Sequence, residues 1–448
     1  MLGSLFPSSA QARPEMPGRR LLAVVVQVAA VILGAVLLLE RIPGLPSWDT
    51  IYAEDYWEFF RQALQQPWHL YIPFGGYEEL LPRVLAQVAT YFPLAEASRV
   101  LAVSGALIAA GSSLFVFHAS AGHIRSVPLR ALLGAAVILM PIAPMELADS
   151  GDTTAWYLML ATFWALLWRP KTRTGMMLAA LVAFAATSGE ITCFLFAPLV
   201  AARIFVLRRP REHAVTAGWL AGCLLQLPAV LEGSSSASAA RLTGQGQLGQ
   251  SLAFYAHDTL LPVFGWHLAW RLQSLAGRNG ATVIMALILA VIIGAILATQ
   301  PRNRLFVVAA VLTGFLFSLV QTTLNPHVAA IPVTLSAEAG SRYSVLPIFL
   351  LEAAVIVGVD YIVRRRAGAR GRRALSVRPA LAVVALIGVL GAGWVADFRY
   401  AGYRSDASRD WQPIAAQWQR ECGRSQSGEI TVRLAGTNYN LPCDRMHA

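Results

Sequence analysis

Apolar runs close to the length of a membrane-spanning helix recur along the whole chain. A transmembrane helix needs about 20 predominantly apolar residues, so this pattern leaves few architectures open. We predict spans at 21–40, 98–117, 127–145, 153–168, 175–187, 191–207, 214–231, 281–299, 304–323, 343–363 and 379–396. The sequence therefore predicts an all-α polytopic membrane protein with about eleven transmembrane helices in the plasma (inner) membrane.

Composition supports this fold class. The chain is 56% hydrophobic and only 14% charged, whereas a soluble domain carries roughly 25% charged residues. The short runs 175–187 and 191–207 are separated by the sequence TSGE. They are predicted as either a tight hairpin or a re-entrant pair, and both alternatives return the chain to the same side of the membrane.

The formal net charge is +11, and the distribution of the basic residues along the chain matches the predicted membrane topology. With residues 1–20 in the cytoplasm, alternation places the basic turns on the cytoplasmic side, as the positive-inside rule requires. These turns contain Arg125, Lys171, Arg208, Arg302 and Arg366. The lipid bilayer is then the partner of the transmembrane domain 21–396, and nucleic acid is excluded because no basic soluble domain is present to bind it.

The C-terminal tail, residues 397–448, is polar and is predicted to lie outside the cell as a small cap. It contains Cys422 and Cys443. An extracytoplasmic location favours a disulfide between them, whereas a cytosolic tail would leave two free thiols. The other two cysteines, Cys193 and Cys223, lie in apolar runs and are predicted to be inert core residues.

A second outer region, 232–270, begins with a polar loop and continues into an apolar segment that holds His257, Asp258 and His267. If this segment crossed the bilayer, the later basic cluster would face outward, against the positive-inside rule. We therefore predict an interfacial or re-entrant segment. The histidines lack the i, i+4 spacing of helical zinc sites, which favours hydrogen bonding or substrate contact over metal binding.

The first extracytoplasmic loop, 41–97, carries the most informative sequence. In AEDYWEFF (53–60) two acids, Glu54 and Asp55, precede a run of aromatics at helical spacing. Such a helix would lie along the membrane interface with its aromatics at headgroup level. In one interpretation the acids only cap the helix N-terminus. In the other, a carboxylate acts as a general base or holds a divalent ion against a lipid phosphate.

An acidic pair in a long first outer loop, on about eleven spans with a soluble tail, resembles the GT-C superfamily of integral-membrane glycosyltransferases that use polyprenyl-phosphate sugars. The loop also resembles a group of uncharacterised bacterial membrane proteins. The shared motifs are the E-D pair, Gly76 and Tyr77, Pro82 and Arg83, Trp156, Gly222 and Gln226, and Ser341, Arg342 and Tyr343.

The resemblance implies roles for the acids. The first-loop acid of GT-C enzymes is the catalytic base, a role that falls on Asp55, then Glu54, with Asp49 as a third candidate. Further acids are expected in the second outer loop, ELADSGDTT, which contains Glu146, Asp149 and Asp152. These acids form either a solvated turn or a second acidic wall of the site. In the second case Asp55 and Asp149 are possible ligands of a Mg²⁺ or Mn²⁺ cofactor, and the sequence leaves open whether one is bound. Glu190 either faces a wet cavity or lies at a hairpin tip.

The donor phosphate needs cations at headgroup depth. Arg342 and Arg83 are the candidates, with Tyr343 beside the first. An arginine can bind a phosphate with two parallel hydrogen bonds, although it can also anchor to ordinary headgroups. The predicted substrate-binding set is Asp49, Trp57, Tyr77, Asp149, Asp152, Trp156, His257 and Asp258.

The sequence thus predicts an inverting glycosyltransferase that moves a sugar from a polyprenyl-phosphate donor to an extracytoplasmic glycan, lipid or protein acceptor. No phosphate-binding P-loop or G-x-S-x-G motif occurs. The alternatives are a multi-pass transporter or a lipid or polysaccharide flippase, and a non-catalytic scaffold. A transporter predicts ionisable residues in mid-membrane, whereas the predicted spans are nearly free of charge in their middles.

Overall fold

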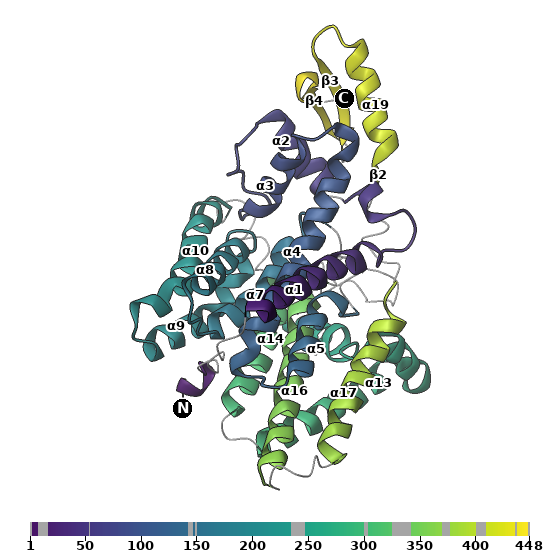
Figure 1. Cartoon of the computed structure of the whole chain (residues 1–448). Helices are drawn as coiled ribbons and strands as arrows, with labels where there is room; N and C mark the ends of the chain where they lie inside the picture. The colour runs from purple at the N-terminus through teal and green to yellow at the C-terminus, as the bar shows by residue number, and fades with distance from the viewer. Residues whose placement is uncertain are drawn as a thin grey trace.

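The computed structural model describes residues 2–7, 17–52, 54–141, 147, 150–233, 247–299, 303–324, 342–369, 377–399, 409–434 and 437–446. A helical body carries a smaller cap at one end (Figure 1). The helices that match the predicted spans are α1 (Pro17–Leu39), α4 (Ala97–Ala119), α5 (Val127–Leu139), α7 (Thr154–Leu167), α8 (Arg173–Thr187), α9 (Ala197–Val206), α10 (Ala214–Gly233), α13 (Trp266–Thr299), α14 (Arg304–Leu324), α16 (Arg342–Ala369) and α17 (Val377–Ala396).

Within the described residues, six helices are long and apolar enough to cross a bilayer. They lie in Leu21–Leu39, Leu94–Gly122, Pro210–Leu231, Trp266–Ala298, Arg304–Thr323 and Arg342–Arg364. The predicted spans at 127–145, 153–168, 175–187, 191–207 and 379–396 correspond to shorter apolar helices. The protein is therefore a multi-pass membrane protein.

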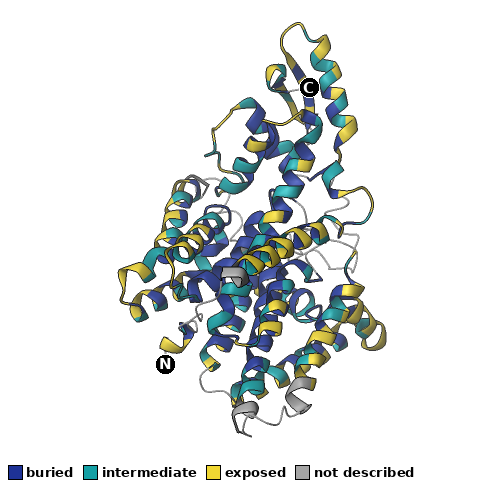
Figure 2. Ribbon diagram, viewed as in Figure 1, coloured by how far each residue is buried: buried dark blue, intermediate teal, exposed yellow. Residues whose placement is uncertain are grey.

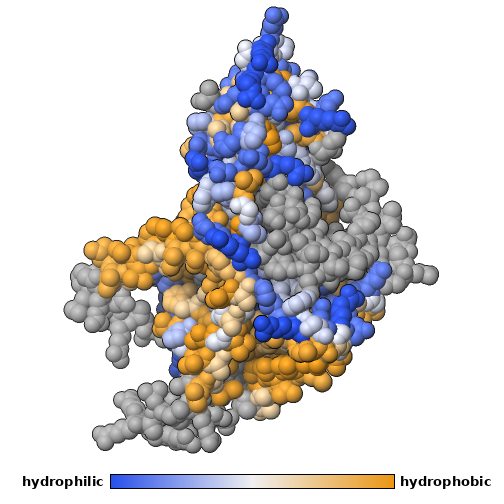
Figure 3. Space-filling model, turned by 90° about the vertical axis from the view of Figure 1, so that its right-hand side faces the viewer, coloured by the Kyte–Doolittle hydropathy of each residue, from blue (hydrophilic) through white to orange (hydrophobic). Residues whose placement is uncertain are grey.

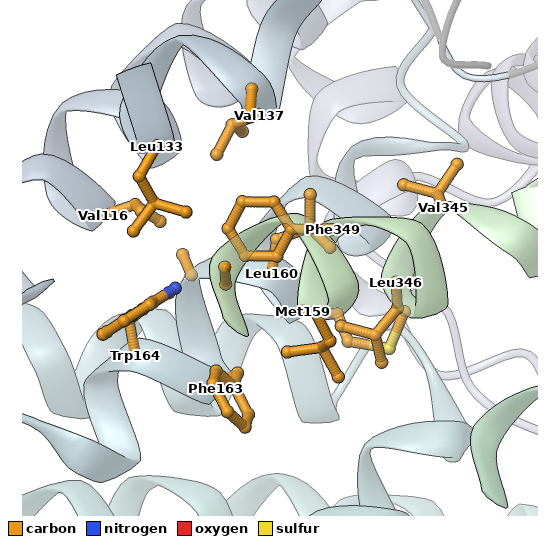
Figure 4. Close-up of a cluster of buried hydrophobic side chains, with 14 of the residues drawn as sticks. Val116, Leu133, Val137, Met159, Leu160, Phe163, Trp164, Val345, Leu346 and Phe349 are labelled. Atoms are coloured by element: carbon orange, nitrogen blue, oxygen red, sulfur yellow. The ribbon is translucent and has the colours of Figure 1, made fainter. Parts of the chain in front are cut away.

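Buried residues are concentrated inside the helical body (Figure 2). Every residue of α7 is buried, and so are most residues in the first half of α16. Their side chains interlock with those of α4 and α5 in a large apolar cluster (Figure 4). A helix that is apolar on all sides belongs inside a bundle or a membrane, and burial inside the protein satisfies that requirement for α7.

The outer helices instead expose apolar side chains. Leu33 on α1 is 60% exposed, and Val291 on α13 is 71% exposed. Figure 3 shows a mainly hydrophobic surface over much of the helical body and a mainly hydrophilic cap above it. Such a belt suits a bilayer, because lipid covers apolar surface that water would penalise.

The segment 251–270 does not form one continuous helix. It contains the end of α12 (Gln247–Phe254), the π-helical turn η8 (Tyr255–Leu260), a short turn, and the start of α13. Gly277 then breaks α13 with φ of 68° and ψ of 166°, so the predicted span 281–299 lies beyond this kink. Buried Asp397 accepts a hydrogen bond from the backbone N–H of Trp266 at 2.6 Å, which caps the α13 N-terminus.

The cap joins the first loop to the C-terminal tail. Strand β1 (Thr50–Ile51) pairs antiparallel with β2 (Arg409–Asp410), and β3 (Glu429–Leu434) pairs with β4 (Thr437–Pro442) beside α19 (Trp411–Arg424), as Figure 1 shows. The predicted disulfide between Cys422 and Cys443 is present. The all-α prediction therefore holds for the body but misses two small sheets in the cap.

The first-loop aromatics pack against protein, which corrects the prediction that they lie at headgroup level. Phe60 and Trp411 are buried with ring centroids 5.6 Å apart, and Tyr56 stacks on Trp418 at 6.0 Å. Here the first loop contains η3 (Asp55–Phe60), α2 (Arg61–Gln65) and α3 (Leu80–Ala89). The C-terminal tail covers the aromatic face, a contact between distant segments that helical spacing alone does not indicate.

The remaining elements are short 3₁₀ helices. They are η1 (Leu2–Leu5), η2 (Ser47–Asp49), η4 (Leu94–Glu96), η5 (Ser120–Gly122), η6 (Ile191–Phe196), η7 (Pro210–His213) and η9 (Cys443–Arg445). At the end of the body opposite the cap, Asp360 accepts hydrogen bonds from the backbone N–H groups of Arg125 and Ser126. The basic turn 125–126 is thus fixed against the far end of α16.

Candidate functional site

Asp55 lies at the junction between the cap and the helical body. Its Oδ2 accepts hydrogen bonds from the Ser150 hydroxyl at 2.7 Å and the Gly151 N–H at 2.9 Å, and its Oδ1 accepts one from the Asp152 N–H at 2.9 Å. A Cβ at Gly151 would lie 3.0 Å from Oδ1, so glycine permits this close approach. The carboxylate therefore binds the turn before α7.

This geometry decides against the interpretation that the acidic pair only caps its own helix. Glu54 is the N-cap of η3, and its side chain makes no capping hydrogen bond. Asp55 begins η3 but binds the 150–152 turn, about 95 residues further along the chain. The first-loop acid thus connects the first loop to the turn before α7.

Asp152 and Arg342 face each other across this site. The Asp152 carboxylate lies 3.8 Å from the Arg342 guanidinium, and the Arg342 side chain remains 26% exposed. Arg342 opens α16, and its guanidinium lies 5.4 Å from the ring of Tyr343. The Tyr343 ring in turn meets the Trp156 ring edge-on, with centroids 5.5 Å apart. The predicted site residues Arg342, Tyr343 and Trp156 therefore form a continuous chain of contacts.

A tight turn brings Tyr77 and Glu79 to the same place. Gly75 and Gly76 adopt φ of 62° and 94°, values that glycine accepts without strain. The Tyr77 hydroxyl hydrogen-bonds the Glu79 carboxyl, and Glu79 interacts electrostatically with Arg342. Glu79 also occupies the N-cap position of α3. Glu79 is therefore a member of the site.

Gln226 of α10 fixes this turn to the end of α8. Its side-chain amide donates to the carbonyls of Glu78 at 2.8 Å and Thr187 at 3.1 Å, and its Oε1 accepts from the Glu78 N–H. A Cβ at Gly222 would lie 2.7 Å from the Thr187 side chain, so Gly222 allows α10 to approach. Both residues position the loop that carries Glu79.

Glu190 lies in the turn between α8 and η6, at the predicted hairpin tip, where it is buried and caps η6. Its carboxylate accepts hydrogen bonds from the Thr192 N–H at 3.1 Å and the Thr192 hydroxyl at 2.8 Å, and it also interacts with Gln321. Burial raises the pKa of Glu190 above its usual value, against the lowering effects of Thr192 and Arg342. Glu190 is therefore one wall of the same acidic site.

Burial and mutual repulsion hold protons on this site. Burial raises the pKa of Glu79 from 4.5 to about 8, and nearby Glu190 and Glu54 act in the same direction. Burial also raises the pKa of Asp152 well above its usual value, with repulsion from Glu54 and Glu79 added and attraction to Arg342 opposing it. Perturbed groups of this kind gather at functional sites.

Arg83 lies beside the site in a separate ion pair. Its Nε is 3.2 Å from Glu78, and both side chains are buried. Arg83 also donates to the Gln62 side chain and to the carbonyl of Ile72. These contacts favour a structural role over the phosphate contact predicted for Arg83.

Several other predicted residues have contacts of their own elsewhere in the cap and the helical body. Asp49 pairs with Arg99 at 4.0 Å on the surface of the cap, and the ring of Trp57 meets Phe74. His257 contacts the Thr282 hydroxyl at 2.8 Å, and Asp258 is buried in η8. Glu146, Asp149 and Ser341 fall outside the described residues.

Within the described part of the chain, no three His, Cys, Asp or Glu side chains are grouped so that they could hold a metal ion. Of the predicted metal ligands, Asp55 already accepts three hydrogen bonds. The other, Asp149, lies outside the described residues, so the metal remains a prediction and no step below depends on one.

Glu79 is the site residue that the sequence analysis missed. The available signal was the second acid of GYEELLPR, placed directly before an apolar helix in the same loop as Asp55. A comparison with models of known protein families finds no match to this chain, and neither does a comparison with curated proteins.

Proposed function

We propose that this protein is a glycosyltransferase of the GT-C kind, which moves a sugar from a polyprenyl-phosphate donor to a hydroxyl acceptor outside the cell. The observation that carries the proposal is the convergence of five acids around Arg342, of which all but the half-buried Glu54 are buried. It joins four separate segments of chain at one end of the helical body. These acids are Glu54, Asp55, Glu79, Asp152 and Glu190.

The geometry suits an inverting transfer. Arg342 is partly exposed at the start of α16, where it can bind the donor phosphate and stabilise the charge that develops as polyprenyl phosphate leaves. A carboxylate of the cluster takes the acceptor proton. The acceptor oxygen then forms its bond to the anomeric carbon as the bond to phosphate breaks.

The proposed topology has eleven spans, with the N-terminus cytoplasmic and the cap extracytoplasmic. The contacts support it, because the site gathers the chain segments that alternation places outside. These are the first loop, the start of α7, the end of α8 and the start of α16. The disulfide in the cap fits an oxidising compartment.

Turnover of defined donors tests this proposal. Purified protein in nanodiscs would receive a panel of polyprenyl-phosphate sugars with candidate acceptors, and free polyprenyl phosphate would be measured. We expect release by the wild type and a loss of at least about tenfold in Arg342→Gln, because the phosphate loses its cation. Arg99→Gln is the matched control, since Arg99 is an exposed arginine of the same outer region. No release with any donor would refute the function.

Transport is the second candidate, and Glu352 is the observation that favours it. Glu352 lies inside α16 and is 2% exposed, and both carboxyl oxygens lack a hydrogen-bond partner among the described residues. The predicted spans were expected to be nearly free of charged residues in their middles, and Glu352 is an exception. Ionisable residues within spans mark transport paths. If the wild type moved a lipid-linked sugar across proteoliposome membranes and Glu352→Gln did not, transport would be the better assignment.

A further inference from the structure

We propose, building on the transfer reaction proposed above, that Glu79 takes the proton from the acceptor hydroxyl. Asp55 is then a positioning residue that acts through the 150–152 turn. This differs from the sequence prediction, in which Asp55 was the expected base and Glu79 had no assigned role. The assignment rests on which carboxylate is committed to the fold and which one retains an oxygen for the acceptor.

Asp55 is committed to the fold. Its two oxygens accept three hydrogen bonds from the 150–152 turn, two of them from backbone N–H groups. Hydrogen bonds of this kind favour the charged carboxylate, so a proton on Asp55 would weaken the contacts that hold the turn. That turn carries Asp152 to within 3.8 Å of Arg342. Asp55 therefore shapes the phosphate-binding side of the site.

Glu79 has the opposite arrangement. It is 6% exposed, and its Oε2 makes no hydrogen bond within the described residues. The Tyr77 hydroxyl orients the carboxyl. The Glu79 side chain makes no capping hydrogen bond at the N-cap position of α3, so protonation of Glu79 would not break a helix cap. Glu79 can accept a proton without dismantling the surrounding structure.

Titratable and charged groups face Glu79 from several segments of the described chain. They are Tyr77 in its own loop, Glu54 before η3, Arg83 on α3, Asp152 before α7, Glu190 after α8 and Arg342 on α16. The carboxyl groups in this set disfavour a further negative charge on Glu79, whereas Arg342 and Arg83 favour it. The balance, together with burial, gives a pKa of about 8, which suits a general base that works near neutral pH.

The proton and electron balance is simple. The acceptor O–H gives its proton to the Glu79 carboxylate, and its oxygen forms the new bond to the anomeric carbon. The bond from that carbon to the phosphate oxygen breaks, and its electron pair leaves with polyprenyl phosphate beside Arg342. Glu79 then returns the proton to water.

The pH dependence of transfer tests this assignment in the full-length protein. We expect kcat/KM of the wild type to rise with pH to a plateau above about 8, as Glu79 loses its proton. Glu79→Gln should lower kcat by about 10²–10⁴-fold with donor binding retained, and Glu79→Asp should restore part of it. Glu96→Gln, an exposed acid of the cap, is the control.

Two further variants separate the roles. Tyr77→Phe removes the hydrogen bond that lowers the pKa of Glu79, so the rising limb should move to higher pH. Asp55→Asn should lower thermal stability and weaken donor binding, yet keep the rising limb. The assignment would be overturned if the rise of kcat/KM with pH survived in Glu79→Gln and disappeared in Asp55→Asn. It would also be overturned if that rise occurred at the same pH in Tyr77→Phe as in the wild type. Absence of transfer by the wild type would overturn the proposed function as well.

Discussion

Asp152 and Arg342 form an ion pair whose strength depends on pH. Because burial and acidic neighbours raise the pKa of Asp152 well above its usual value, this carboxyl carries a proton over a wider pH range than a surface aspartate. When it ionises, it would compete with the donor phosphate of the proposed reaction for Arg342, which lies 3.8 Å away. Under the proposed function, one aspartate would thus tune how strongly the site holds the anionic donor.

This competition predicts the behaviour of Asp152→Asn. The affinity of the wild type for polyprenyl phosphate should fall as pH rises and Asp152 ionises, whereas the variant should bind several-fold more tightly at alkaline pH and lose most of that dependence. Binding to nanodisc-embedded protein across a pH series would measure it. Equal pH dependence in both proteins would contradict the competition.

Raised carboxyl pKa values also predict how stability depends on pH. Burial raises the pKa of Glu78 from 4.5 to about 7, and that of Glu79 to about 8. The folded protein then binds these protons more tightly than the unfolded chain. Their contribution to stability is full below about pH 4.5 and is lost as pH rises through 7 and 8.

We therefore expect the thermal midpoint in detergent to fall from mildly acidic to alkaline pH, with a shallower fall in Glu79→Gln. Glu78→Gln should in addition leave the buried Arg83 without its partner. Breaking a buried pair in this way costs about 3–5 kcal/mol. The double variant Glu78→Gln with Arg83→Met should recover much of that loss. A midpoint that rises with pH would contradict the assignment.

At the scale of elements, helix α4 supports the site through a glycine. A Cβ at Gly105 would lie 2.7 Å from the carbonyl oxygen of Ser150, in the turn that Asp55 binds. Gly111 on the same helix would meet nothing within 4 Å. The two glycines therefore have opposite expected responses to a methyl group.

Gly105→Ala should displace the 150–152 turn, costing about 1–3 kcal/mol and lowering transfer. Gly111→Ala, the matched control, should be neutral or stabilising by up to about 1 kcal/mol, because alanine favours the helix. Thermal unfolding and the transfer assay measure both. Equal effects of the two substitutions would show that α4 does not support the turn in this way.

The cap depends on Trp411, which is fully buried. Its indole N–H donates to the carbonyl of Leu94 at 2.7 Å, and its ring packs on Phe60 and Trp418. Trp411→Ala should destabilise the cap by about 3–5 kcal/mol and expose the C-terminal tail to limited proteolysis. A variant tail as protease-resistant as that of the wild type would contradict the packing.

Local pattern predicted the helices but not their partners. Apolar runs of helical length placed α1, α4, α10, α14 and α16 within a few residues, because each run reflects its own surroundings. The pairing of Thr50 with Asp410 joins segments about 360 residues apart, and no local period encodes it. For the same reason, local sequence could not indicate that Tyr56 packs on Trp418 instead of lying at the membrane surface.

The candidate site was partly predictable. Asp55, Asp152, Arg342 and Trp156 stood out as polar or aromatic residues at the ends of apolar runs, and the structure brings them together. Glu79 could not be ranked, because its importance comes from burial beside Glu190 and Arg342. Burial and the pKa shifts that it causes are properties of the folded molecule.

At the scale of the whole molecule, the eleven-span topology predicts which surfaces are accessible from outside. In a variant whose free cysteines Cys193 and Cys223 are replaced by alanine, Gln417→Cys on the exposed face of α19 should react with a membrane-impermeant maleimide in intact cells. Lys171→Cys, in an exposed turn at the other predicted side, should react only after lysis. The reverse pattern would overturn the orientation and the extracytoplasmic site with it.

The central claim is that a polyprenyl-phosphate lipid binds at the acidic site around Arg342. Photocrosslinking with a polyprenyl phosphate that carries a photoreactive group near the phosphate, followed by mass spectrometry, tests this most directly. The account predicts crosslinked peptides from the first loop around Tyr77 and Glu79 and from the start of α16, with loss of labelling in Arg342→Gln. Specific labelling confined to other segments, or none at all, would contradict it.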